Sequence, residues 1–420
     1  MVRLGGAYLE SPTKRATTTL KGYIMKILTV GACPYLLTHL GRMNAALIEH
    51  LVDNGHEVQS AVWHLDTSWF LPDKDDKFYY EKNGKKLCVL RPFYNQPVET
   101  ATPQLYEIIR EAEPDVVVSL SNYTDIAPLY AIKALDPKMI KWVSVIASAA
   151  SPINDEFFEA IKMADTVFAT RNQTREEIVS ADIPCTYQPF GPNHGSFYSL
   201  ASSGREEDCL RIMGCAKNSQ SSNIGAFMEA AKIIKSDDIK VYLHVNHSST
   251  GDYELRKLNA RYGNAVALPD SFISINEGIP DEELNKEYNK SDIVVDVSVR
   301  SSTALSVLEA MCSGCIPIIS PVGALKELGE MIKEYECFPR SIRYVGDNGE
   351  NYEIVDPNSL AELLEYFCNF KKERKKEFEE LRCKMIEVSS AFCSKKFVEE
   401  IEKTIKEIDS NDRTISVDVI

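Results

Sequence analysis

Short apolar runs rich in β-branched residues alternate with amphipathic helical segments along most of this sequence. The run KILTVG, Lys26–Gly31, has the composition of a buried strand. The segment after it carries Met43, Leu47 and Leu51 at near-helical spacing and ends at a turn signal before Gly55. This alternation predicts parallel sheets joined by crossover helices. Further strand-like runs follow at 114–120, 140–146, 165–170, 210–214, 240–246, 293–299 and 316–320.

The alternation breaks once, at 183–208, where proline, glycine and serine are dense. Two series of strands in 420 residues predict two doubly wound α/β domains that face each other across a crevice. A last helix carries Phe397, Ile401 and Ile405 on one face, and this apolar stripe requires a surface to pack on. We therefore expect a domain at 25–190, a linker at 191–208, a second domain at 209–390, a C-terminal helix at 391–410 and a tail at 411–420.

Charge and cysteine content exclude several classes of protein. The net charge of −15 disfavours a nucleic-acid partner, whose phosphates would be repelled. No run approaches the roughly 18–20 apolar residues of a membrane span. Eleven irregularly spaced cysteines, with Cys312 and Cys315 as the one close pair, indicate reduced structural thiols and a cytoplasmic protein.

The first 24 residues differ from the rest in composition. They contain four basic residues, one acidic residue and a threonine run, without the apolar segment of a secretory signal. Met25 begins the first strand-like run. We expect residues 1–24 to be a disordered leader.

One carboxylate stands in an apolar helical segment of the second half. In the stretch VVDVSVRSSTALSVLEAMCSGCIPIIS, Val294–Ser320, Glu309 is flanked by Leu308 and Ala310. A buried carboxylate is costly without a partner, and its sequence neighbours supply none. Glu309 is therefore a candidate ligand-binding residue.

Three segments resemble the large group-one family of retaining GT-B glycosyltransferases. The stretch GIPDEELNKEYNKSDIVVDVSVRSSTALSVLEAMCSGCIPIIS is similar to the family's donor-binding region. LIEHLVDNGHEV, Leu47–Val58, is similar to its first helix and second strand, and PFGPNHGSF, Pro189–Phe197, to its domain junction. The resemblance covers roughly Lys26 to Ile405 and implies that the last helix crosses back onto the first domain.

The resemblance gives Glu309 a role. The family has two glutamates eight positions apart that face a nucleotide-sugar donor, and the second accepts hydrogen bonds from the ribose hydroxyls. Glu309 matches this second glutamate, with a structural pairing to a buried cation as the alternative. Ser301 stands in place of the first glutamate, beside Arg300. Either an unusual donor sugar, paired with Arg300, or a degenerate site is expected, and a solvated Arg300 is the other reading.

The turn into the helix of Glu309 offers backbone N–H groups for a diphosphate. Ser302, Thr303, Ala304 and Leu305 form this turn, where small residues and the helix dipole favour an anion. The family's clamping arginine is replaced by Cys215, and Lys217 in the same loop is a candidate substitute. We expect Lys217 and Arg300 to stabilise charge on the leaving diphosphate.

The first domain should bind the acceptor. Gly31, at the end of the first strand, is expected to let the backbone approach the donor. The family's histidine after the run at 114–120 is missing. The acceptor-side candidates are His39, Ser121, Asn122 and His194.

The resemblance implies transfer of a sugar from a nucleotide-sugar donor to an acceptor with retention of configuration, without metal or cofactor. The acceptor, the base and the sugar stay open. A catalytically degenerate nucleotide-sugar-binding or scaffolding protein of the same fold is the alternative. A sugar-nucleotide epimerase would require an acid/base set that the sequence does not offer. Peripheral membrane contact is not expected, because the chain is acidic.

Overall fold

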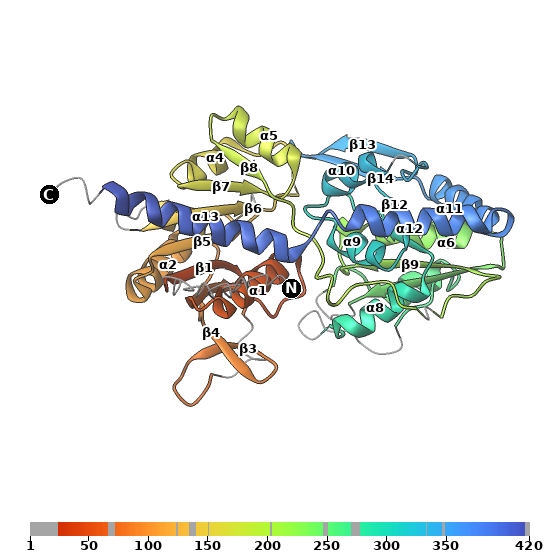
Figure 1. Cartoon of the computed structure of the whole chain (residues 1–420). Coiled ribbons are helices and arrows are strands. Elements are labelled where there is room, and N and C mark those ends of the chain that lie inside the picture. The colour runs from red at the N-terminus through yellow and green to blue at the C-terminus, as the bar shows by residue number, and fades with distance from the viewer. Residues whose placement is uncertain are drawn as a thin grey trace, which may run out of the picture.

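The computed structural model describes residues 24–65, 72–122, 125–133, 140–149, 151–201, 204–246, 251–269, 278–332, 334–346 and 349–415. The expected leader lies outside these residues apart from Ile24, and so do positions 416–420 of the expected tail. Two α/β domains stand side by side, and a long C-terminal helix returns from the second domain to the first (Figure 1). The predicted fold class is confirmed.

The first domain is built on an eight-stranded sheet of order β3-β4-β2-β1-β5-β6-β7-β8. All neighbouring strands are parallel except β3 and β4. The inner strands are buried along most of their length, which is why they read as continuous apolar runs in the sequence. The strands are β1 Lys26–Ala32, β2 Glu57–Trp63, β3 Phe78–Lys82, β4 Lys85–Pro92, β5 Val116–Ser121, β6 Lys141–Ile146, β7 Thr166–Ala169 and β8 Cys185–Tyr187.

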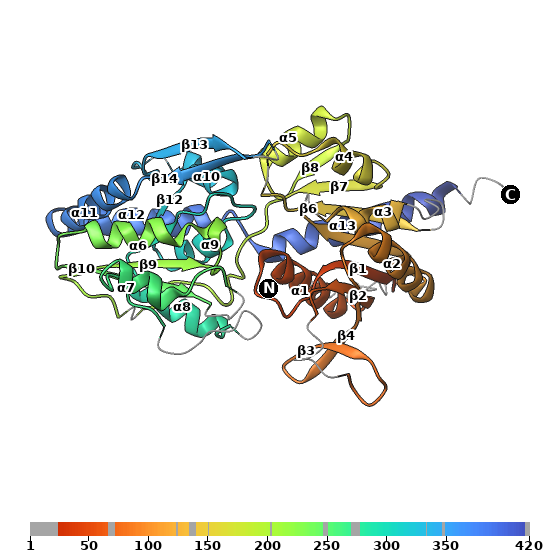
Figure 2. The ribbon, with the colours of Figure 1, turned by 180° about the vertical axis from the view of Figure 1, so that it is seen from behind.

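Helices cover both faces of this sheet. The helices are α1 His39–Asp53, α2 Val98–Ala112, α3 Ile126–Lys133, α4 Asp155–Ile161, α5 Asn172–Ser180 and, from the far end of the chain, α13 Ser394–Ile415. Helices α1 and α13 pack together on one face, and α2 and α3 pack together on the other (Figures 1 and 2).

The loop before α1 is tightly folded. The Thr38 hydroxyl accepts a hydrogen bond from the backbone N–H of Gly41 and so caps the helix. A Cβ atom at Gly41 would lie 2.2 Å from the carbonyl oxygen of Leu36, so only glycine fits there. The helix ends at Asp53, before Gly55, as the sequence predicts.

The second domain has a four-stranded parallel sheet of order β10-β9-β11-β12 and a separate hairpin, β13-β14. Its strands are β9 Leu210–Ala216, β10 Ile239–Val245, β11 Ile293–Asp296, β12 Ile316–Ile319, β13 Ser341–Val345 and β14 Asn351–Val355. Its helices are α6 Ile224–Ile233, α7 Leu255–Arg261, α8 Asp281–Lys290, α9 Leu305–Cys312, α10 Gly323–Met331, α11 Pro357–Glu373 and α12 Lys375–Ser389, with a 3-10 turn at Gln220–Ser222.

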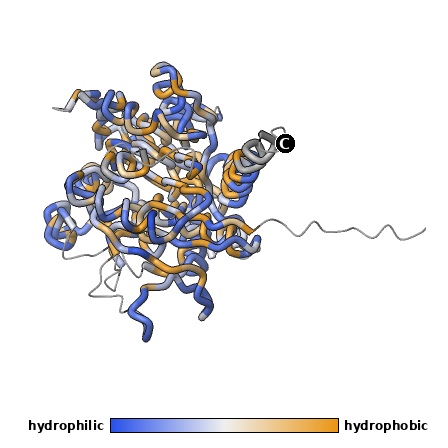
Figure 3. The backbone as a smooth tube through the Cα atoms, turned by 90° about the vertical axis from the view of Figure 1, so that its left-hand side faces the viewer, coloured by the Kyte–Doolittle hydropathy of each residue, from blue (hydrophilic) through white to orange (hydrophobic). Residues whose placement is uncertain are grey.

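Each domain has its own hydrophobic core, and α13 belongs to the first. Phe397, Ile401 and Ile405 are fully buried in the first-domain core, where the Phe397 ring meets the edge of Phe190. The expected return of the last helix is therefore confirmed. It begins at Ser394, three residues after the predicted start. Apolar segments gather inside the molecule and hydrophilic ones line its outside (Figure 3).

The sequence reading missed both antiparallel hairpins. The β3-β4 turn at Asn83 and Gly84 has positive φ at both residues, which is the geometry of a two-residue hairpin. Both β3 and β4 carry exposed lysines, so neither reads as a buried strand.

Candidate functional site

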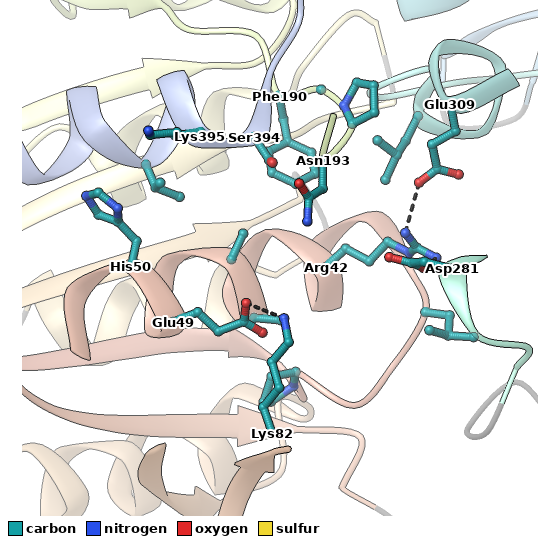
Figure 4. Close-up of a pocket in the computed structure, with 18 of the residues that line it drawn as sticks. Arg42, Glu49, His50, Lys82, Phe190, Asn193, Asp281, Glu309, Ser394 and Lys395 are labelled. Carbon is teal, nitrogen blue, oxygen red and sulfur yellow. Dashed lines mark hydrogen bonds and ion pairs between the residues drawn. The ribbon is translucent and has the colours of Figure 1, made fainter. Parts of the chain in front are cut away.

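A pocket of about 380 Å³ lies between the two domains (Figure 4). Helix α1 forms one side, the segment that leaves the first domain and the start of α13 form another, and helices α8 and α9 contribute residues from the second domain. Two of the predicted donor residues, Leu305 and Glu309, line it. Its lining includes Arg42, Glu49, Lys82, Asp281, Leu305 and Glu309.

Glu309 is held by an arginine of the other domain. Nη1 of Arg42, in the first turn of α1, donates to Glu309 Oε1 at 2.9 Å. Nη2 of the same guanidinium donates to Asp281 Oδ1, at the start of α8, at 3.1 Å. The guanidinium also lies 5.9 Å from the ring centre of Phe197. The Arg42 side chain of the first domain thus contacts three residues of the second part of the chain: Glu309, Asp281 and Phe197.

Burial governs the charge of this carboxyl group. Glu309 is 4% exposed, and burial raises its pKa while Arg42 lowers it, with the outcome of about 7. The partly buried Cys215 and the fully buried Tyr288 of the second domain lie beside it. Burial raises the pKa of the Cys215 thiol to about 12, and the Tyr288 hydroxyl makes no hydrogen bond of normal geometry within the described residues.

The structure shows the pairing to a cation that the sequence leaves open as the alternative for Glu309. Its sequence neighbours offer no partner, and the cation is Arg42, 267 positions earlier in the chain. No signal in the sequence marks Arg42, which lies in an ordinary first helical turn. Glu309 is therefore paired with Arg42 in this structure.

The turn before α9 is fixed by contacts to both domains. The Ser301 carbonyl accepts from the N–H of Ala324 at 3.1 Å, and the Ser302 carbonyl accepts from the hydroxyl of Thr170 at 3.4 Å. Ala304 adopts a left-handed conformation with φ 51° directly before the helix. Ser302, Thr303 and Ala304 are buried.

Leu305 begins α9 at the expected turn and lines the pocket. Its side chain also packs against the first-domain core. Its apolar contact joins the domains, so any part that Leu305 has in binding a diphosphate must come from its backbone.

A buried arginine beside this turn escaped the sequence reading. The side chain of Arg171, just before α5, is 1% exposed and donates through Nη1 to the Ser148 carbonyl at 3.0 Å. Burial lowers its pKa, and Glu327 of α10 lies 3.9 Å from its Nε. A Cβ atom at Gly323 would lie 3.3 Å from its Nη1 and 2.1 Å from the Ser301 carbonyl oxygen. Arg171 of the first domain therefore lies next to Gly323, which packs on the Ser301 turn.

The two predicted catalytic cations, Arg300 and Lys217, interact with different parts of the molecule. Arg300 forms an ion pair with Glu350 of the β13-β14 connection at 3.6 Å, so its charge is already balanced by a buried carboxylate. Lys217 is exposed, and its positive charge, together with burial as the larger cause, lowers the pKa of His64 in the first domain. Lys217 thus faces the first domain, whereas Arg300 is held within the second.

Three acceptor-side candidates gather at the ends of β5 and β6. Burial lowers the pKa of His39 to about 4 against a hydrogen bond to the Ala147 backbone, and Ala147 donates its N–H to the Ser121 carbonyl at 2.9 Å. Nε2 of His39 and the Ser121 hydroxyl are buried without a hydrogen-bond partner among the described residues. The Asn122 N–H donates to Asp125, whose pKa burial raises to about 6. Asp125 gave no sequence signal.

His194 and Gly31 have structural contacts that the sequence reading did not foresee. His194 donates from Nε2 to the Phe392 carbonyl at 2.7 Å, and its Nδ1 lies 3.5 Å from the Cys312 sulfur, so both ring nitrogens are engaged where the chain crosses between domains. A Cβ atom at Gly31 would lie 3.3 Å from Cβ of Leu120. Packing against β5 is therefore sufficient reason for this glycine.

The eleven cysteines are free thiols, and seven are buried. Within the described part of the chain, no group of three or more His, Cys, Asp and Glu side chains could hold a metal ion. None of the described helices is long and apolar enough to cross a membrane.

Comparison with known proteins identifies the architecture. No protein-family model and no curated protein sequence matches this chain. A sucrose-phosphate synthase from Thermosynechococcus elongatus superposes with a TM-score of 0.70 at 15% identity, covering 92% of this chain and 99% of that one. The chain has the GT-B fold.

Two further solved structures agree with this assignment. A glycosyltransferase from Rickettsia africae gives a TM-score of 0.65 at 15% identity over 92% of this chain and 99% of that one. An α,α-trehalose 6-phosphate synthase from Burkholderia multivorans gives 0.64 at 9% identity over 94% and 99%. At these identities the likeness establishes the GT-B fold of this chain.

Proposed function

We propose that this chain is a glycosyltransferase that moves a sugar from a nucleotide-sugar donor to an acceptor with retention of configuration. The observation that carries the proposal is the place of Glu309. Its buried carboxylate lies on α9 of the second domain and lines a pocket shared by both domains. The position is the one that the resemblance assigns to ribose binding.

The chemistry of this carboxylate suits a diol. An ionised carboxylate accepts hydrogen bonds from two neighbouring hydroxyls, and each such charge-assisted bond contributes about 1.5–3 kcal/mol. Glu309 lies on α9, and hydrogen bonds from residues of both domains hold the turn before this helix. A ligand bound there would contact the first and second domains together.

Stabilisation of the leaving diphosphate is assigned to the turn before α9 and to Lys217. The N-terminus of α9 directs backbone N–H groups and the positive end of the helix dipole toward this turn. The small side chains of Ser302 and Ala304 suit the close approach of a phosphate to the backbone. Lys217 is exposed and faces the first domain, so its ammonium group is available without breaking an ion pair in the described residues.

The acceptor is assigned to the first domain, beside His39, Ser121 and Asn122. The imidazole of His39 is neutral at physiological pH, with Nε2 unpaired among the described residues. It can therefore accept a hydrogen bond from an acceptor hydroxyl, whereas its lowered pKa makes it a weak proton acceptor. The mechanism proposed for this site uses no metal. The free thiols support a reducing, cytoplasmic setting.

Calorimetric titration with uridine, guanosine, adenosine and thymidine diphosphates and their glucose derivatives tests the proposal. Glu309→Gln should weaken nucleotide binding by roughly ten- to a hundredfold, because charge assistance to the ribose hydroxyls is lost. Glu330→Gln, on the exposed side of α10, is the matched control and should bind as the unmodified chain does. Binding of none of these nucleotides would contradict the proposal, and binding without any sugar transfer would favour the catalytically degenerate alternative.

A further inference from the structure

Arg42 of the first domain inserts its guanidinium among three residues of the second domain. Asp281 begins α8, Glu309 lies within α9, and Phe197 is 1% exposed in the second-domain core. The guanidinium enters from α1 and uses two separate nitrogens for two carboxylates. A planar guanidinium held at both edges and over a ring has a fixed orientation.

This fixed cation opposes the effect of burial on the charge of Glu309. A protonated carboxyl group would lose its charge and present a donor to the ribose diol, whereas the ionised group only accepts. Burial and the carboxylate of Asp281 favour the protonated form of Glu309, whereas Arg42 favours the ionised form. The titratable and charged groups that face Glu309 from the elements around it are Arg42, Asp281, Tyr288, Cys215 and Cys312.

We propose that Arg42 is a positioning residue for the donor: from the first domain it holds the Glu309 carboxylate in place and favours its ionised form, so that the ribose diol meets a charged acceptor. This inference rests on the proposed function, because it assumes that Glu309 binds the ribose. It adds a coupling that the fold alone does not supply. The donor-binding carboxylate of one domain depends on a cation of the other, so donor affinity depends on how the domains meet.

An opposite role for Arg42 would also fit a static ion pair. If Arg42 merely occupied Glu309 and had to leave before the donor could bind, its removal would strengthen nucleotide binding. The positioning role requires the reverse. The two roles therefore separate on the direction of one affinity change.

Four variants form the test. Arg42→Met removes the cation and keeps an apolar stem, and Arg42→Lys keeps the charge without the planar fork. Asp281→Asn removes the second carboxylate. Arg211→Met is the matched control, because Arg211 forms a similar partly buried pair with Glu287 at 2.7 Å wholly within the second domain.

The first readout does not need a nucleotide. In chains labelled with ¹³C at the glutamate carboxyl carbon, the Glu309 signal is the one missing from Glu309→Gln, and its shift against pH gives the titration midpoint. Arg42→Met should move this midpoint upward and Asp281→Asn should move it downward. Arg42→Lys should return it toward that of the unmodified chain. A merely structural role would destabilise the variants without opposite shifts.

The second readout is nucleoside diphosphate affinity at neutral pH and above. Arg42→Met should bind about tenfold or more weakly at neutral pH and recover as the pH rises, because each unit of pKa is a factor of ten in protonation. Arg211→Met should bind as the unmodified chain does. Unmoved midpoints, unchanged affinity or tighter binding in Arg42→Met would each overturn the positioning role. Shifted midpoints in a chain that binds no nucleotide would overturn the proposed function, and the donor role of Arg42 with it, while confirming that Arg42 sets the charge of Glu309.

Discussion

The Glu327 carboxylate of α10 caps helix α5 of the other domain, accepting hydrogen bonds from the backbone N–H groups of Gln173 at 2.9 Å and its neighbour Asn172 at 3.0 Å. A carboxylate at a helix N-terminus satisfies donors that have no partner within the helix and stabilises the helix dipole. Here the capping group and the helix belong to different domains. Together with Arg42 and Glu309, this contact ties the two domains by charged groups.

Removal of this cap should be measurable. Glu327→Ala should lower the free energy of unfolding by about 1 kcal/mol, the usual value for a helix N-cap. Urea denaturation followed by circular dichroism measures this loss. Glu330→Ala, one turn along the same helix and exposed, is the control. An equal loss in both variants would show that the cap contributes nothing beyond helix propensity.

The return of α13 should carry much of the stability of the first domain. Phe397 is fully buried against Phe190, so Phe397→Ala should cost about 3–5 kcal/mol through lost contacts and the cavity left behind. Denaturant titration gives the loss. Tyr366→Ala removes an aromatic ring that is 53% exposed on α11 and should cost far less. A similar cost at both positions would contradict the placement of α13 in the core.

Glu402 of α13 should contribute to the free energy of unfolding at neutral pH and lose this contribution in acid. Burial alone would raise its pKa, but hydrogen bonds from Lys406, His50 and His56 lower it to about 2. Because the folded pKa lies below the ordinary 4.5, the stabilisation is complete above about pH 4.5 and is lost as the pH falls toward 2. Glu402→Gln should therefore be less stable than the unmodified chain at neutral pH, with a difference that narrows below about pH 4.5.

His39 should change the stability of the protein at higher pH than Glu402 does. Burial holds the folded pKa at about 4, below the ordinary 6.5, so the unfolded chain takes up the proton first. Stability due to a neutral His39 is full above pH 6.5 and falls as the pH drops toward 4. His39→Gln should flatten the fall in that range, as measured by urea denaturation at a series of pH values. Parallel curves for His39→Gln and the unmodified chain would contradict the buried neutral imidazole.

The sequence predicted the elements that bury both of their faces. Strand β5 reads as Val116, Val117 and Val118 in succession, because helices cover both sides of a parallel sheet and no polar alternation is needed. Strand β3 lies at the edge of the sheet, carries exposed Lys82 and gave no such pattern. Its turn at Asn83-Gly84 was readable in principle.

The site was predictable only where its residues are neighbours in the chain. Glu309 stands out locally, since a carboxylate among apolar residues must be accommodated. Its partner Arg42 lies on another domain, and Asp125 and Arg171 become notable only through burial. Pairing across domains is a property of tertiary structure, and one sequence carries no record of which cation meets which carboxylate.

The two segments that join the domains touch each other. Ser394 donates its N–H to the Pro192 carbonyl at 3.1 Å, and a Cβ atom at Gly191 would lie 2.4 Å from the carbonyl carbon of Phe392. Since α13 completes the first domain, that domain is formed by two separate stretches of the chain and the second domain is inserted between them. A fragment ending at 190 would expose the face that Phe397 covers. Gene fusions, split-protein designs and circular permutations of this chain should therefore keep the two ends together and cut within the inserted half.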